Sequence, residues 1–259
     1  MTASAKLRLD QYLAQSGLVP SRERARALIL AGRILVNEQK IDKPGTTVSP
    51  DSVVRILGEQ QRYVSRGGLK LEHALEHWQI AVAGRHCLDI GTSTGGFTDC
   101  LLQHGAASVS CVDTGFGQIA VSLRNDVRVY LHERTNARLL PPGHFAASRD
   151  GRLPVPTLLV MDVSFISATL VLPAVLAAAP MLEEAVILIK PQFEAGREHV
   201  GKGGIVRDPA AHAFAIERVT ECLRELQASA VEIIPSPITG AEGNVEFLLH
   251  AILTAGRTL

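Results

Sequence analysis

Four charged residues stand in otherwise apolar stretches of this 259-residue chain. Lys190 comes directly after "VILI" and before a proline, and Asp162 comes directly after "LLVM". Lys70 lies in "SRGGLKL" and Glu246 in "GNVEFLL". Two amines and two carboxylates could move a proton and stabilise a developing charge, because burial and neighbouring charges tune such groups for acid–base chemistry.

Each of these residues also has a plain structural explanation. Lys70 could be a solvated helix residue, Lys190 could extend its ammonium out of a buried strand, and Glu246 could be a charge that protects a sheet edge. Four such residues with alternating signs are harder to explain in this way. The set therefore favours a catalytic site.

A glycine-rich stretch suggests a cofactor. In "CLDIGTSTGGF" an apolar strand is expected to end at Ile90 and a helix to begin after Gly95. The spacing differs from the G-x-G-x-x-G of dinucleotide-binding loops, and no lysine is present for a phosphate-binding loop. With Asp113 lying 24 residues after Asp89, the pattern resembles the S-adenosylmethionine loop of Rossmann-like methyltransferases. A nicotinamide site and a purely structural loop are the alternatives.

Two carboxylates and one downstream segment complete the expected cofactor site. Asp89 leads into the loop and suits a ligand that carries a positive amine. Asp113 ends the next strand, where a carboxylate can accept both ribose hydroxyls of a nucleoside. Residues after the third strand usually contact adenine in such enzymes. The expected set is Asp89, Gly91, Thr92, Ser93, Thr94, Gly95, Gly96, Asp113, Thr135 and Asn136.

Alternating strands and helices must position these side chains. The expected strands are 87–90, 108–112, 127–131, 157–162, 185–190, 231–234 and 245–253. Helices are expected after Gly95, Gly117, Ser167 and Asp208. This alternation predicts an α/β fold with a Rossmann-like, mostly parallel, seven-stranded sheet covered on both faces. Because the carboxyl ends of parallel strands face the ligand crevice, Asp162 and Lys190 should lie together beside the cofactor.

The N-terminal part of the chain is expected to be a separate small domain. Residues 1–70 carry 12 Lys or Arg and 6 Asp or Glu, a net charge of +6, whereas residues 71–259 carry 14 and 20, a net charge of −6. Such asymmetry is expected of a nucleic-acid-binding appendage. Two short helices are expected, the second with Ser21 as its N-cap. The expected domains are residues 6–60 and 67–259, joined by a linker at 61–66.

The sequence from Arg8 to Gly45 resembles the alpha-L RNA-binding domain, a small α+β fold shared with a small-subunit ribosomal protein. The resemblance implies that the helix pair and the basic residues around it grip structured RNA by backbone and shape. Glu38 departs from the pattern, because many members have glycine there, which alters a turn.

The glycine-rich connection 191–208 is either a second RNA surface or a mobile surface loop. The expected RNA-contacting residues are Arg8, Arg22, Arg24, Arg26, Arg33, Lys40, Lys43, Arg66, Arg197, Lys202 and Arg207.

Six further motifs extend the resemblance to nearly the whole chain. They are "YVSRGGLKL", "DIGTSTGGFTD", "HERTNAR", "MDVSFIS", "IKPQFEAG" and "GNVEFLL". They resemble the TlyA (hemolysin A) family, whose catalytic domain is similar to the FtsJ-type RNA ribose methyltransferases. The resemblance implies S-adenosylmethionine-dependent 2′-O-methylation of ribosomal RNA, typically at a cytidine. The family's lysine–aspartate–lysine–glutamate tetrad falls on Lys70, Asp162, Lys190 and Glu246.

The tetrad suits this reaction, because a ribose hydroxyl is a weak acid and a poor nucleophile. Lys190 would accept its proton or steer it, and Asp162 would orient that lysine. Lys70 would stabilise negative charge on the oxygen, and Glu246 would hold the other members in place.

Two other functions stay open at this point. A protein that keeps the fold but only binds RNA or ribosomes would transfer no methyl group. A membrane-active hemolysin is suggested by the family's older name alone. The uncharged stretch 163–182 has nearly the length of a membrane span, but Pro173 and Pro180 interrupt it, and we expect a strand end, a short helix and a loop.

The cysteines and the first residues bound the setting. The four cysteines have no metal-ligand spacing, so we expect no metal and buried, reduced thiols. The first 15 residues have no apolar signal-peptide core. With 46% hydrophobic residues the chain can form a core. We therefore expect a cytoplasmic protein whose partner is ribosomal RNA or a ribosomal subunit, with no membrane and no obligate protein partner evident.

Overall fold

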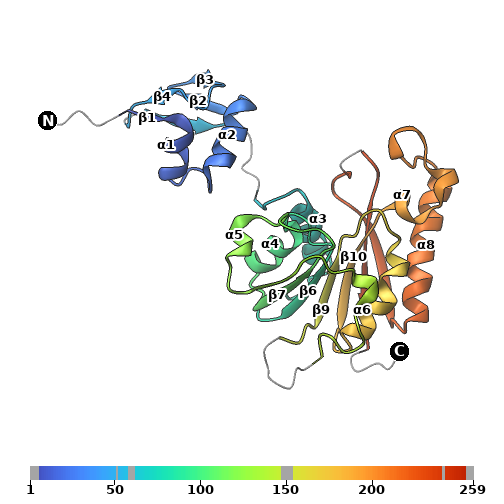
Figure 1. Cartoon of the computed structure of the whole chain (residues 1–259). Helices are drawn as coiled ribbons and strands as arrows, with labels where there is room; N and C mark the ends of the chain where they lie inside the picture. The colour runs from blue at the N-terminus through green and yellow to red at the C-terminus, as the bar shows by residue number, and fades with distance from the viewer. Residues whose placement is uncertain (1–5, 51, 58–61, 147–153, 241–242, 255–259) are drawn as a thin grey trace. The chain divides into compact units, whose positions relative to one another are not determined.

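The computed structural model describes residues 6–50, 52–57, 62–146, 154–240 and 243–254. The chain divides into two compact units, Met1–Gln61 and Arg62–Leu259. Both are drawn in Figure 1, and each is described here by itself.

The first unit is a small α+β fold. It has two helices and two small antiparallel sheets, one of β1 and β4 and one in the order β3-β2-β5. Apolar residues of the helices, such as Leu13 and Ile29, pack with Ile34 into a core of their own. Ser21 caps the second helix, as expected, by accepting the backbone N–H of Arg24 at 3.2 Å. The elements are β1 Leu7–Arg8, α1 Leu9–Gln15, α2 Arg22–Leu30, β2 Ile34–Val36, β3 Gln39–Ile41, β4 Thr47–Val48 and β5 Val54–Ile56.

The unusual Glu38 lies in the tight turn between β2 and β3. Both Asn37 and Glu38 have positive φ values, 49° and 63°. A two-residue hairpin turn of this kind favours Asn-Gly, so the glutamate adopts a backbone conformation that suits glycine better. Its carboxylate accepts a hydrogen bond from Arg55 on β5 at 2.8 Å, which offsets part of this cost.

The expected linker belongs largely to the second unit. Gln61 lies outside the described residues, but Arg62 to Arg66 pack against the helices that follow. Tyr63 is buried and donates its hydroxyl to Glu72 at 3.0 Å, and the backbone N–H of Val64 donates to Asp99 at 2.8 Å. An aromatic ring that fills a core position makes this segment part of the fold rather than a linker.

The second unit is built on a seven-stranded sheet in the order β11-β12-β10-β9-β6-β7-β8. Strands β6 to β10 run parallel, and β12 runs antiparallel to both β10 and β11. This confirms the predicted fold class. The strands are β6 His86–Ile90, β7 Ser108–Val112, β8 Val129–His132, β9 Leu158–Met161, β10 Glu184–Ile189, β11 Ala230–Pro235 and β12 Phe247–Ile252.

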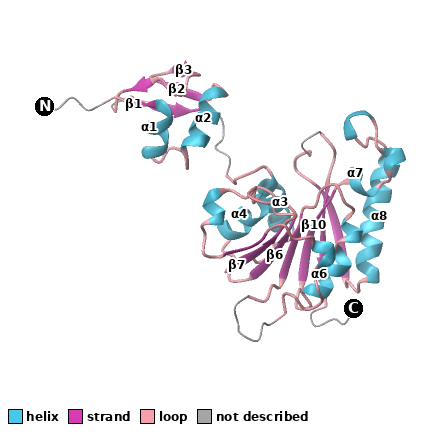
Figure 2. Ribbon diagram, in the orientation of Figure 1, coloured by secondary structure: helices cyan, strands magenta, loops and turns pink. Residues whose placement is uncertain are grey.

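Helices cover both faces of this sheet (Figure 2). Alternate strand residues point to opposite faces, so Leu159 packs with α6 and α8, whereas Val160 packs with α3 and α4. Asp208 caps α8 as expected, accepting the N–H of Ala210 at 2.9 Å. The helices are α3 Gly67–His77, α4 Gly96–Gln103, α5 Val121–Arg124, η1 Ala137–Leu139, η2 Ala168–Leu170, α6 Leu172–Ala178, α7 Pro191–Glu194, η3 Arg197–His199, η4 Lys202–Gly204 and α8 Pro209–Glu225.

Several expected element boundaries are wrong by one or two residues. The third strand, β8, begins at Val129 rather than at Val127, because Asp126 accepts the N–H of Arg128 and holds the chain in a turn. The last strand begins after Glu246, not before it. The stretch 163–182 forms a loop, η2 and α6, and in the described part of the chain no helix has the length and apolarity needed to cross a bilayer.

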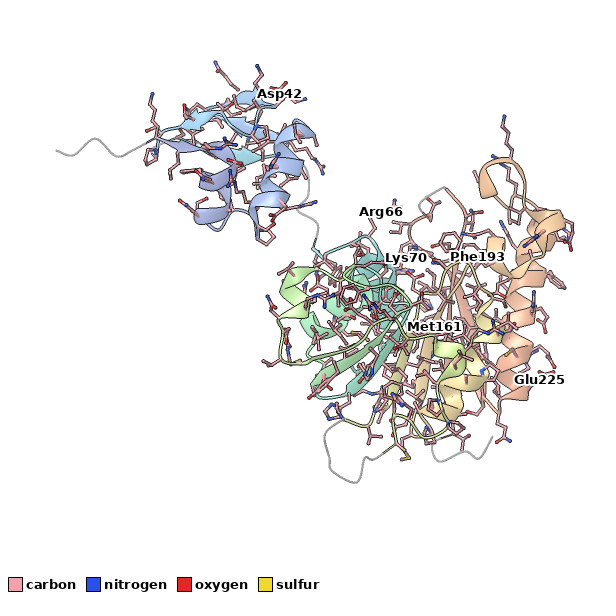
Figure 3. All side chains as sticks on the ribbon, in the orientation of Figure 1. Asp42, Arg66, Lys70, Met161, Phe193 and Glu225 are labelled. Carbon is pink, nitrogen blue, oxygen red and sulfur yellow. The ribbon has the colours of Figure 1, made fainter. Side chains whose placement is uncertain are left out.

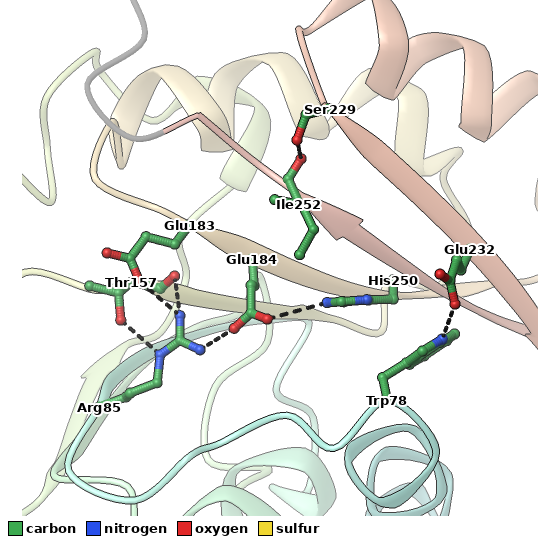
Figure 4. Close-up of polar contacts among 9 residues, drawn as sticks. All are labelled: Trp78, Arg85, Thr157, Glu183, Glu184, Ser229, Glu232, His250 and Ile252. Carbon is green, nitrogen blue, oxygen red and sulfur yellow. Dashed lines mark hydrogen bonds and ion pairs between the residues drawn. The ribbon is translucent and has the colours of Figure 1, made fainter.

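The edge of the sheet where the parallel strands begin is held by a polar network (Figure 4). Arg85, just before β6, donates to Thr157 Oγ1 at 3.0 Å and pairs with Glu184 at the start of β10. His250 on β12 contacts the same glutamate and stacks on Trp78, the residue directly after α3. These contacts fasten neighbouring strands and helices together, so this edge serves the fold.

The four cysteines are free thiols. Cys87, Cys100 and Cys111 are buried, and burial raises the pKa of Cys87 and of Cys100 to about 12. Cys222 departs from the expectation because it is only half-buried, on the side of α8.

Candidate active site

Lys190 and Asp162 form an ion pair at the carboxyl ends of adjacent strands. Lys190 is the residue after β10 and Asp162 the residue after β9, and Lys190 Nζ lies 2.5 Å from Asp162 Oδ1. The ammonium also donates to Ser164 Oγ at 2.7 Å. The side chain of Lys190 is only 11% exposed, so its head group is held by these two partners at the edge of the sheet. The sequence predicted the pair but not Ser164.

Lys70 and Glu246 form a second, more buried ion pair. Lys70 lies in the first turn of α3, and Glu246 lies just before β12. Their side chains are 9% and 3% exposed, and Lys70 Nζ donates to Glu246 Oε2. Burying two charges is costly unless they are paired, so each residue requires the other.

The strand register brings the four expected residues to the same edge of the sheet. Ile189 of β10 is aligned with Phe247 of the antiparallel β12, and one step further the chain reaches Lys190 on one strand and Glu246 on the other. Figure 3 labels Lys70 and Phe193 in the upper part of the unit, with Met161, the last residue of β9, below them. The structure therefore groups the four residues as two ion pairs at one edge.

The glycine-rich loop lies directly against the Asp162 strand end. Gly91 has φ +85°, and a Cβ there would lie 2.5 Å from the backbone oxygen of Asp162. A Cβ on Gly96 would lie 2.2 Å from Ser65 Oγ and 3.0 Å from the N atom of Gly68, where α4 meets α3. Both positions need glycine because backbone approaches backbone, and this contact joins the expected cofactor loop to the ion pairs.

A cavity of about 520 Å³ opens beside this loop. Its size is in the range of small-molecule sites in proteins. Among the expected cofactor residues, five line it: Gly91, Ser93, Asp113, Thr135 and Asn136. Asp162, Ser164 and Phe165 line it as well. The cavity therefore extends from the expected nucleoside site to the partners of Lys190.

Asp113 keeps acceptor capacity in this cavity. Its Oδ2 accepts the N–H of Ser93 at 2.8 Å, and its Oδ1 accepts the N–H of Gly115 at 2.7 Å. A carboxylate has about four lone-pair positions, so both oxygens can accept further bonds from a ligand. The backbone oxygen of Asp113 accepts the N–H of Thr135 at 2.9 Å, which connects the two expected contact segments.

The remaining expected cofactor residues do not line this cavity. Thr94 is exposed, whereas Thr92, Gly95 and Gly96 are buried in the loop and at the start of α4. Asp89 is fully buried below the loop, where its Oδ2 accepts the hydroxyl of Thr98 at 2.6 Å.

Burial raises the pKa of Asp89 to about 7, against the lowering effect of the bond from Thr98. Its Oδ1 is buried and has no hydrogen-bond partner among the described residues. Buried acceptors in a protein core are normally hydrogen-bonded, so this free oxygen is better explained as a position where a cationic group or a water molecule binds.

Three residues at or near the site, Ser164, Phe165 and Glu194, were not predicted from the sequence. Phe165 is 92% exposed and has φ +64°, a rare conformation for a bulky residue and one found at functional sites. Glu194 is 2% exposed and accepts Ser167 Oγ at 2.5 Å and the N–H of Ala168 at 2.7 Å. Burial raises its pKa. A phenylalanine next to polar residues after a strand was the available signal for Phe165; nothing local indicated the long-range contacts of Glu194.

The basic residues expected to bind RNA fall into two groups. In the first unit, Arg8 and Arg22 both bind the buried Asp10, each through Nε at 3.0 Å. The bond from Arg8 contributes most to lowering the pKa of Asp10 to about 2. The others of this unit are exposed except for the half-buried Arg24: Arg24, Arg26, Arg33, Lys40 and Lys43. Two expected RNA contacts are thus also structural ion-pair partners.

In the second unit the exposed expected residues are Arg66, just before α3, and three residues in the connection 191–208: Arg197, Lys202 and Arg207. This connection is only partly a loop, because it begins with α7 and is anchored by Asn244. The Asn244 side chain accepts the N–H of Val206 and donates to the oxygen of Gly204, both at 2.9 Å. RNA contact at these positions stays a prediction.

Within the described residues, no group of three or more His, Cys, Asp or Glu side chains has the arrangement of a metal site.

Comparison with known families and proteins agrees with this geometry. The family model for FtsJ-like methyltransferases matches residues 63–252, and the S4 domain model matches residues 7–54. The "16S/23S rRNA (cytidine-2'-O)-methyltransferase TlyA" of Mycobacterium tuberculosis is 45% identical over 98% of this chain and 92% of its own. "Hemolysin A" of Brachyspira hyodysenteriae is 40% identical over 95% of this chain and 100% of its own. A solved structure described as "Putative hemolysin from Streptococcus thermophilus" has a TM-score of 0.68 at 39% identity and covers 98% of this chain and 90% of that one.

Proposed function

Because this chain belongs to the family of FtsJ-like methyltransferases that carry an N-terminal S4 domain, we propose that it transfers a methyl group from S-adenosylmethionine to a ribose 2′-hydroxyl of ribosomal RNA. The target nucleoside is a cytidine, as the name of the mycobacterial relative states for that protein. The observation that carries the proposal is the Lys190–Asp162 ion pair, since Asp162 lines the cavity that Gly91 and Asp113 also line.

The residues around the cavity fit S-adenosylmethionine. The free acceptor positions of Asp113 suit two ribose hydroxyls, and the Thr135–Asn136 segment suits the adenine. Asp89 does not line the cavity, but in its ionised form this buried carboxylate places a negative charge below the loop, which favours a cationic ligand. When bound, S-adenosylmethionine supplies an electrophilic methyl group on a sulfonium.

Lys190 and Lys70 have different roles at the ribose oxygen. Lys190 either steers the hydroxyl as an ammonium or, as a neutral amine, accepts its proton as the oxygen–methyl bond forms, and Asp162 and Ser164 fix the direction of its head group. Lys70 provides a fixed positive charge for the oxygen, and the ion pair with Glu246 holds that lysine in place. Positioning of the hydroxyl in line with the methyl group contributes much of the rate, because it converts a bimolecular encounter into a local step.

The substrate class is supported by the S4 domain and its exposed basic residues. Arg26, Arg33 and Lys43 are exposed and suit contacts to RNA phosphates. Ribosomal RNA, free or within a subunit, is the proposed substrate, because structured RNA can be read by its shape and backbone through such exposed basic residues.

The test is transfer of labelled methyl groups from S-adenosylmethionine to isolated ribosomal subunits. We expect transfer by the wild type and a loss of at least about 10²-fold for Lys190→Ala, as for removal of a general base. Lys6→Ala, a change at an exposed lysine outside both proposed sites, is the control. Lys190→Arg keeps a cation beside Asp162 but removes a group that can accept a proton, so its inactivity would favour proton acceptance over steering. Absence of transfer to every subunit would leave an RNA-binding protein without this activity.

A further inference from the structure

Glu194 is a buried carboxylate that the proposed reaction does not use. It ends α7, one residue after Phe193, which Figure 3 labels. Glu194 is not among the residues that line the cavity in the described part of the chain, and so it has no direct path to a bound ligand there. Burying a carboxylate this deeply costs free energy unless it has hydrogen-bond partners, so its position needs a structural reason.

The partners of Glu194 directly follow, in the chain, the residues 162–166 that line the cavity. Its two carboxylate oxygens accept from neighbouring residues at the start of η2: Oε2 from the hydroxyl of Ser167 and Oε1 from the N–H of Ala168. Ser167 Oγ also lies 2.7 Å from Thr169 Oγ1 and accepts the N–H of Thr169. Glu194 therefore fixes the downstream end of the segment that begins at Asp162.

That segment, residues 162–167, carries both contacts of the Lys190 ammonium. Asp162 and Ser164 bind Lys190 Nζ at 2.5 and 2.7 Å. Phe165, which follows, has the unfavourable φ of +64°, and its ring lies 5.4 Å from that of Phe193. A segment with such a residue needs restraints on both sides to persist.

The two restraints come from the same short helix. Lys190 directly precedes α7 and Glu194 is its last residue, so the two ends of one helical turn hold the 162–167 segment at two points. The backbone oxygen of Glu194 in turn accepts Arg218 of α8 at 2.8 Å, which anchors the turn to a long helix. Without Glu194 the segment is held to α7 chiefly by the lysine contacts and the Phe165–Phe193 ring contact.

We propose that Glu194 is a positioning residue for methyl transfer: by holding Ser167 and Ala168, it keeps Ser164 and Asp162 in place around the Lys190 ammonium. The inference rests on the proposed function, because it acts through Lys190. It assigns no contact between Glu194 and either substrate or cofactor.

The conservative change at this position separates hydrogen bonding from charge. Glu194→Gln can accept the N–H of Ala168 through its oxygen and donate to Ser167 Oγ, whose hydroxyl then turns to Thr169 Oγ1. We expect this variant to keep kcat within about threefold of the wild type, whereas Glu194→Ala lowers kcat about tenfold or more per folded molecule, as displacement of a reacting group does. The matched control is Glu225→Gln, at an exposed glutamate at the end of α8.

A double-mutant cycle with Ser164→Ala then tests the route. If Glu194 acts through the contacts of Lys190, its alanine variant lowers kcat by a smaller factor once Ser164 is already alanine than it does in the wild type. A merely structural residue would show independent, multiplicative effects. Hydrogen exchange at the Ala168 amide gives a second readout, and we expect it to be faster in Glu194→Ala than in the wild type.

The outcomes separate the two proposals. An inactive wild type on ribosomal subunits would overturn the proposed function and this inference with it. An active wild type with unchanged kcat in Glu194→Ala, multiplicative effects in the cycle, or unchanged exchange at Ala168 would overturn the positioning role alone.

Discussion

Replacing Glu246 with alanine removes one partner of a buried ion pair and leaves Lys70 as a charge that is only 9% exposed. Breaking such a pair from one side costs about 3–5 kcal/mol in the free energy of unfolding, because the remaining charge is neither solvated nor paired. The second unit spans Arg62–Leu259, and for a domain of this size about 1 kcal/mol shifts the melting temperature by roughly 2–4 °C. We therefore expect a fall of roughly 6–20 °C in the melting temperature of this unit.

Removing both charges should restore stability but not activity. Lys70→Met with Glu246→Met replaces the pair by unbranched apolar side chains, a change that is often neutral or stabilising for buried pairs. The assay is thermal unfolding followed by circular dichroism, with methyl transfer to ribosomal subunits measured on the same samples. The control is Glu217→Ala, which breaks an exposed pair with Arg224 and should cost at most about 1 kcal/mol.

Two results would refute this reasoning. A double variant as unstable as Glu246→Ala would mean that the cost does not come from an unpaired buried charge. A stable double variant with wild-type methyl transfer would mean that Lys70 contributes to the fold and not to the reaction.

Three further predictions concern stability. Asp89 has a pKa of about 7 in the folded unit, above its ordinary value, so between about pH 4 and 7 the folded unit holds a proton that the unfolded chain has lost. The stability that this proton gives should decrease as the pH rises from about 4 to 7, and the midpoint of unfolding in urea should fall with it. Asp89→Asn should make the midpoint depend less on pH over this range. Asp10 has the opposite shift, to about 2, so its contribution to the first unit is present above about pH 4 and lost towards pH 2; Asp10→Asn should remove this acid transition in a circular-dichroism titration. Glu38→Gly should stabilise the first unit by about 0.5–1 kcal/mol in thermal unfolding, because it relieves a positive φ at the cost of one exposed ion pair, and an unchanged midpoint would contradict this.

The sequence was most informative where local pattern and topology coincide. Asp162 and Lys190 each end an apolar run, and the rule that parallel strands finish at the same edge was enough to bring them together. Gly91 and Gly96 were identifiable as close-approach positions, although the atoms they approach belong to the Asp162 strand end and to α3. Local patterns of this kind predict the path of the backbone, and that path determines which strand ends lie next to each other.

Contacts between distant side chains were not predictable in this way. Glu194 could have been one more surface charge in "KPQFE", and only packing of α7 against η2 gives it partners. Arg8 and Arg22 look like exposed cations in the sequence, yet both bind the buried Asp10, because α1 and α2 bring the three residues together. The prediction of a linker was wrong for the same reason, because Tyr63 fills a core position that a local sequence pattern does not specify.

The most direct test of the central claim is nucleoside analysis of ribosomal RNA after incubation of subunits with the protein and S-adenosylmethionine. Nuclease digestion to nucleosides and mass spectrometry distinguish a methyl group on the ribose from one on the base. We expect new 2′-O-methylcytidine, which Lys190→Ala does not form. A methyl group on a base, or equal product from Lys190→Ala, would contradict this expectation.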